Sequence, residues 1–228
     1  MSVSKDPPQI LQRLAAPPLS IRIEPGLEEA ELARIETEFS IEFPPDLRAL
    51  LANGMPVGSA PPPPGATGRS SGFPDWRNTS TEELRRELSR PLDAVLFDVR
   101  ERGFWFTSWP DRPESLDEAL AFAAREIMRA PRLVPVYGRR YISSAPVESG
   151  NPILSVYQTD VICYGADLDD YFENEFFDKH DEFHRRGGTV TKPVRHIPFW
   201  GELAGFSCVA LTGRRDNSPA AHAVRCRS

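Results

Sequence analysis

The chain has 228 residues, of which 40% are hydrophobic and 10% aromatic, so it can bury the core of one large domain. Its formal net charge of −6 argues against a nucleic-acid-binding surface, which needs clustered lysine and arginine to neutralise phosphates. Neither a signal-peptide run nor a window approaching a membrane span is present, so we expect a cytoplasmic protein outside the membrane.

Residues 1–26 contain spaced prolines and are expected to form a loosely ordered lead-in outside the core, although Ile10, Leu11 and Leu14 could form one short helical turn. We expect a single domain over residues 27–212. Its first part shows the 3–4-residue spacing of two amphipathic helices, with a proline break between them. The apolar positions of the first are Leu32, Ile35 and Phe39, and those of the second are Leu47, Leu50 and Leu51.

Residues 55–75 are dominated by proline, glycine and serine, which predicts a mobile surface loop inside the domain. A proline-rich ligand for SH3-type partners is the functional alternative for this segment. The second composition-biased segment is the basic stretch at residues 213–228, for which we expect a disordered tail.

Capping-box spacing predicts two further helix starts, at Ser80 with Glu83 and at Ser115 with Glu118. The first helix is expected to end before Pro91, and the second to support the sheet through a long apolar face. Between them, two β-branched and aromatic runs of strand length are interpreted as strands, at residues 94–99 and 103–109.

Four more apolar runs follow, separated by breaks too short for parallel crossovers, which favours antiparallel neighbours. They cover residues 133–138, 140–143, 153–158 and 161–165. The fold class we predict is α+β, with a largely antiparallel sheet of about five to six strands and helices packed on it. Residues 166–184 then predict one acidic helix with an aromatic face.

The acidic helix is a candidate docking face for a basic protein partner, although charge runs are more often plain solvated surface. Its candidate residues are Asp167, Asp169, Asp170, Glu173, Glu175 and Asp178. Two tryptophans, Trp105 and Trp109, are candidates for an aromatic contact patch, with packing in the core as the stronger alternative.

Catalytic and metal-binding patterns are weak in this sequence. The pair His180 and His184 has the i, i+4 spacing of a zinc hydrolase, but Asp181 is shorter than the required Glu and no third ligand stands at a known offset. The cysteines lack CxxC spacing, and no phosphate-binding glycine loop or Ser/His/Asp order is present. We therefore expect a non-enzymatic protein without metal or cofactor, with zinc-dependent hydrolysis as a remote alternative.

The block from Leu133 to Phe177 resembles the hallmark block of the SUKH superfamily, the Smi/Knr-like domains first named for fungal cell-wall assembly regulators. The resemblance extends over Leu32 to Trp200 and departs from the family at Arg139, where a histidine is expected in the turn. It implies an α+β binding module, often a bacterial immunity protein that neutralises a toxin by direct contact. The implied partner is a cognate, basic, possibly nuclease toxin; a regulatory or scaffold role in envelope or secretion assembly is the alternative.

Overall fold

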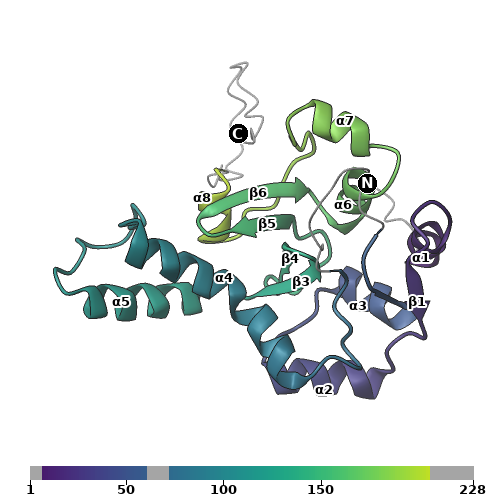
Figure 1. Ribbon diagram of the computed structural model, residues 1–228, viewed down its shortest axis with the longest axis horizontal. Coiled ribbons are helices and arrows are strands. Elements are labelled where there is room, and N and C mark those ends of the chain that lie inside the picture. Colours follow the sequence, from purple (N-terminus) through teal and green to yellow (C-terminus); the bar gives the residue numbers. More distant parts are fainter. Residues whose placement is uncertain (1–6, 61–71, 206–228) are drawn as a thin grey trace.

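The structure is a computed structural model that describes residues 7–60 and 72–205 (Figure 1). Its main sheet is an antiparallel meander in the order β3-β4-β5-β6. The strands are β3 (Leu133–Tyr137), β4 (Arg140–Ser143), β5 (Ile153–Tyr157) and β6 (Asp160–Gly165). All four apolar runs predicted after residue 132 are therefore strands, and their short connections make sequence neighbours pair in space.

The strands β3, β4 and β5 are buried on both faces, because neighbouring side chains in them belong to different core clusters. Val134 and Ile142 join one cluster with the N-terminal helices. Leu133 and Tyr141 join the other cluster with the long helices that follow residue 80. This burial explains why the strands are nearly continuous apolar runs rather than alternating ones.

The N-terminal half contributes three helices and a small second sheet to the first cluster. These elements are α1 (Pro7–Ala15), β1 (Arg22–Glu24), α2 (Glu29–Phe39), α3 (Pro45–Asn53) and β2 (Met55–Val57), with β1 antiparallel to β2. The helices α2 and α3 are confirmed: each buries the three apolar side chains expected of it. Helix α3 starts at a proline, which lacks the amide hydrogen that a first helical turn leaves unpaired.

Helix α1 is part of the core, which corrects the expectation that residues 1–26 lie outside it, as far as residues 7–26 are concerned. Leu14 has no exposed surface, and Ile10 and Leu11 are 3% and 6% exposed. These three side chains lie on one helical face that packs against α3. The prolines at the start of this segment are accommodated in the first turn of α1, where they cost no hydrogen bond.

The segment 55–75 is ordered at both described ends. Strand β2 opens it, and Phe73 donates its amide hydrogen to Gly58 O over 2.7 Å. Gly72 is required here, since a Cβ would lie 1.9 Å from the same Gly58 oxygen. Phe73 and Trp76 are buried, whereas the expected mobile loop and the SH3-ligand alternative fall mainly on residues 61–71, which lie outside the described residues.

Helix α4 (Thr81–Glu101) runs through Pro91 and includes the run 94–99, so the predicted helix end and the strand at 94–99 are wrong. Its buried positions Leu84, Pro91, Val95 and Val99 repeat at helical spacing. A short apolar run satisfies helix and strand patterns alike, and tertiary burial decides between them. The run 103–109 is also not a strand, so the expected sheet of five to six strands is replaced by one of four strands and one of two.

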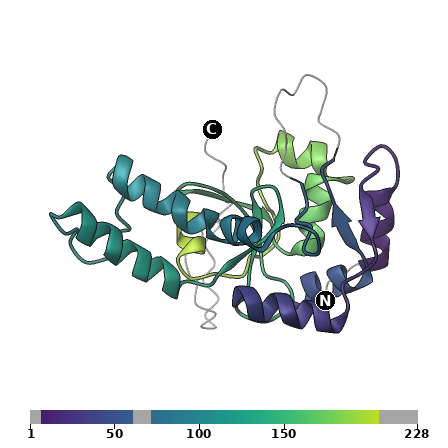
Figure 2. The same cartoon turned by 60° about the horizontal axis from the view of Figure 1, so that its bottom comes forward.

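Helix α5 (Leu116–Arg129) packs on α4 and lies beside the C-terminal part of α4, which extends away from the sheet, while α4 itself also contacts β3 and β5 (Figures 1 and 2). Both predicted caps are present: the Ser80 and Ser115 hydroxyls accept from the Glu83 and Glu118 amides. The main contact of α5 is α4 rather than the sheet, although Ala123 and Ile127 of α5 join the second core cluster together with strand residues.

The predicted single acidic helix is broken into α6 (Leu168–Glu175) and α7 (His180–Arg185). The physical reason lies in two phenylalanines. Phe176 packs at 5.0 Å from the Tyr137 ring in the first core cluster, whereas Phe183 packs at 5.2 Å from the Tyr164 ring and is buried in the second. One straight helix cannot reach both clusters. The last described helix is α8 (Trp200–Leu203), and the predicted tail lies outside the described residues.

Candidate protein-binding surface

The six acidic candidates of the α6 region do not form one exposed face. Asp170 and Glu173 are 4% and 7% exposed, and Asp167, Asp169 and Glu175 are half-buried. Only Asp178 among the six is exposed. The sequence count of acids therefore overstates the negative surface of this region.

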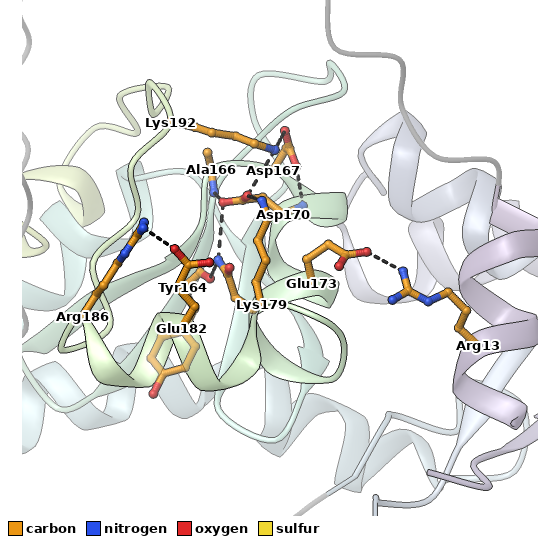
Figure 3. A network of polar contacts seen from close by, with 11 residues as sticks. Arg13, Tyr164, Ala166, Asp167, Asp170, Glu173, Lys179, Glu182, Arg186 and Lys192 are labelled. Atoms are coloured by element: carbon orange, nitrogen blue, oxygen red, sulfur yellow. Dashed lines mark hydrogen bonds and ion pairs between the residues drawn. The ribbon is translucent and has the colours of Figure 1, made fainter. Parts of the chain in front are cut away.

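Asp170 is the centre of a buried ionic network (Figure 3). Its Oδ2 accepts from the Ala166 amide at 3.2 Å, and its Oδ1 lies 3.1 Å from Lys192 Nζ and 3.4 Å from Lys179 Nζ. Burial raises the pKa of Asp170, but these hydrogen bonds and lysines outweigh it, and the pKa falls below its usual value. Asp167 caps α6 and lies 3.7 Å from the same Lys192.

Two arginines pair with three further acids of α6 and its C-terminal end. Arg13 of α1 pairs with Glu173 and, over 3.0 Å, with Asp178. Arg140 of β4 pairs with Glu175 over 3.3 Å. Together with the two lysines, these contacts place basic side chains beside most of the acidic candidates. A partner-binding role for this region stays a prediction, with a much weaker electrostatic basis.

The structure brings Trp105 and Trp109 together, with ring centroids 4.9 Å apart. Trp109 also stacks on Phe199 at 6.0 Å, and the Trp105 indole donates to Pro110 O. Both tryptophans are half-buried and pack against the second core cluster, so core packing buries most of their surface. Figure 1 shows their loop, between α4 and α5, far from α6 with the sheet between them.

The histidine pair lies on α7, with ring centroids 4.5 Å apart. Partial burial and the neighbouring His180 lower the pKa of His184. Across residues 7–60 and 72–205, no group of three or more His, Cys, Asp or Glu side chains is arranged to hold a metal ion. The described geometry thus offers a zinc ion two imidazoles but not the further protein ligands of known zinc sites.

An open groove of about 600 Å³ lies between α4 and the end of β5, and sequence reasoning missed it. Two aromatic side chains at its walls are unusually exposed for their type: Phe97 at 38% and Tyr157 at 52%. Its other lining residues are mainly charged: Glu83, Arg86, Glu87, Arg90, Asp93, Ala94, Arg139, Val156 and Gln158. An open groove with aromatic side chains and charges of both signs is suited to contacting another protein.

The strand wall of the groove is held to α4 by one buried carboxylate. Asp98 is 1% exposed, and its Oδ2 accepts from both the amide (3.0 Å) and the hydroxyl (2.7 Å) of Thr159. Gln158, next in the same turn, has a φ of 58°, which is uncommon for a residue other than glycine. The anchoring by Asp98 holds this turn, and therefore Tyr157 and Gln158, beside the helix.

Tyr141 of β4 is fully buried. Burial raises the pKa of its hydroxyl to about 12, and the nearby Arg90 guanidinium offsets part of that effect.

A helical interpretation of residues 81–101 predicts the helix side of this groove. Glu83, Arg86, Glu87, Arg90 and Phe97 recur at intervals of three, four or seven residues and so share one face. Treating residues 94–99 as a strand separated Phe97 from that face. The strand side of the groove depends on tertiary contacts that no local pattern encodes.

Comparison with protein-family models, with curated proteins and with solved structures finds no match to this chain. In the part of the chain that the structure describes, no helix is both long enough and apolar enough to cross a membrane.

Proposed function

We propose that this chain is a cytoplasmic protein-binding module of the immunity type, which neutralises a cognate toxin by direct contact. The observation that carries the proposal is the groove between α4 and β5, with Phe97 and Tyr157 exposed at its walls. Exposed aromatic side chains on fixed backbone contribute strongly to protein interfaces, because they bury large area at little cost in conformational entropy.

The immunity role itself draws on the resemblance of the block Leu133–Phe177 to the SUKH superfamily. The antiparallel meander of β3 to β6 agrees with the α+β fold which that resemblance implies. The groove carries Arg86, Arg90 and Arg139 against Glu83, Glu87 and Asp93, a balance of zero. The partner surface that enters it is therefore not required to be basic, and an overall basic toxin would be attracted by the net charge of −6 instead.

Growth rescue tests the proposal. The candidate toxin is the product of a gene next to this one in its host, expressed from an inducible promoter with and without the full chain. We expect co-expression to restore growth and the purified pair to bind by calorimetry. A toxin that stays lethal and shows no binding would contradict immunity and favour the regulatory alternative.

Two matched variants test whether the groove makes the contact. Phe97→Ala with Tyr157→Ala removes the exposed aromatics of the groove, and each truncation at a binding hot spot costs about 2 kcal/mol, or roughly 30-fold in Kd. Leu116→Ala with Met128→Ala removes two exposed apolar side chains of α5 that do not line it. Equal loss of rescue in both double variants would show that the groove is not the contact surface.

A further inference from the structure

Arg139 is the cation of the groove that is best placed for a ligand. It lies in the turn between β3 and β4, and its guanidinium carbon is 4.4 Å from the centroid of the Tyr157 ring. Within the described ranges no carboxylate pairs with it. A guanidinium stacked on an aromatic face has a fixed orientation and keeps the N–H groups at its edge available, and their geometry matches a carboxylate.

The neighbouring charges are already engaged within α4. Arg90 pairs with Glu87, and Asp93 accepts from the Ser89 hydroxyl. Arg90 therefore neutralises Glu87, and the Asp93 carboxylate is oriented toward its own helix. On the strand side of the groove, the Arg139 guanidinium therefore leaves a positive charge that an acidic group of a ligand can neutralise.

The walls of the groove indicate a peptide rather than a simple anion. Gln158 lines the groove beside the exposed Tyr157 ring, and its side-chain oxygen has no hydrogen-bond partner in the described part of the structure. An unpaired buried polar atom costs about 1–3 kcal/mol, so a ligand that pairs with it gains affinity. An extended peptide supplies amide donors and carbonyl acceptors along its whole length, and its side chains can pack on Phe97 and Tyr157.

We propose that the groove binds an extended segment of the partner protein that carries an Asp or Glu side chain, with Arg139 pairing with that carboxylate. This inference rests on the proposed protein-binding function and adds the chemistry of the bound segment. The segment lies between α4 and the end of β5. Its apolar side chains cover Phe97 and Tyr157, and its backbone pairs with the side-chain amide of Gln158.

Selection of random 12-residue peptides against the full chain by mRNA display tests this inference. We expect the enriched peptides to share an acidic residue beside apolar ones. Their affinity, measured by fluorescence anisotropy, should fall at least about tenfold in Arg139→Glu and in the milder Arg139→Gln. Arg85→Glu is the matched control, because Arg85 is an exposed residue of α4 that does not line the groove.

A charge swap completes the test. Replacing the acidic residue of a selected peptide by lysine should abolish binding to the unchanged chain and restore binding to Arg139→Glu. Peptides without acidic enrichment, equal affinity for Arg139→Glu and Arg85→Glu, or no enriched peptide at all would each overturn the inference. Growth rescue by the intact chain would still stand in those cases, so failure here is distinguishable from failure of the proposed function.

Discussion

Replacing Asp98 with alanine is expected to lower the free energy of unfolding by about 3 kcal/mol. The carboxylate accepts two hydrogen bonds from Thr159, and its Oδ1 lies 3.4 Å from Arg102 Nε. Removing it leaves the partly buried amide and hydroxyl of Thr159 without their acceptor, at about 1–2 kcal/mol each, and Arg102 without its ion pair. For a chain of this size, such a loss lowers the Tm by about 6–12 °C.

Thermal and urea unfolding followed by circular dichroism measure the effect. Asp98→Asn should lose clearly less, since its amide oxygen still accepts from Thr159. Asp93→Ala is the control: Asp93 is exposed on the same helix, and its loss should cost less than about 0.5 kcal/mol. If Asp98→Ala and Asp93→Ala unfold at the same temperature, Asp98 does not hold the turn as we infer.

Three further predictions concern the N-terminal helix α1 and two ion pairs that lie away from the groove. Leu14→Ala should cost about 2–5 kcal/mol in urea unfolding, because Leu14 is fully buried; a loss below about 1 kcal/mol would contradict the core position of α1. Arg13→Ala, which removes the pairing with Glu173, should cost about 1 kcal/mol, with the difference shrinking in 1 M NaCl; a salt-independent loss would point to packing instead. The Arg77 hydrogen bond lowers the pKa of Glu31 from 4.5 to about 2, so its stabilisation is present above pH 4.5 and is lost as pH falls toward 2. The free energy of unfolding of the unchanged chain should therefore exceed that of Glu31→Gln by about 1 kcal/mol at pH 7, after solvent screening, and this difference should disappear as the pH falls to 2. A difference that stays constant from pH 7 to 2 would refute the pairing.

Local patterns predicted the elements whose signals lie within a few neighbouring residues. The caps at Ser80 and Ser115 are recognisable because a hydroxyl and an amide three residues apart bond directly. The strands β3 to β6 are recognisable because short breaks force neighbouring runs to pair. The strand prediction for residues 94–99 was wrong for a related reason. Six apolar-rich residues fit both the helical and the strand periodicity, and the packing of α5 on one face of α4 favours the helix.

The sequence by itself determined the α+β class, the antiparallel meander and the starts of most helices, because these depend on spacing, turns and caps within short windows. Only the tertiary structure decided which charges remain available to a partner. Asp170 and Glu173 were countable as acids, but their neutralisation depends on Lys192 and Arg13, which are distant in sequence. The groove beside Arg139 likewise joins α4 to strand ends that are distant in the sequence, and such surfaces exist only after the chain has folded.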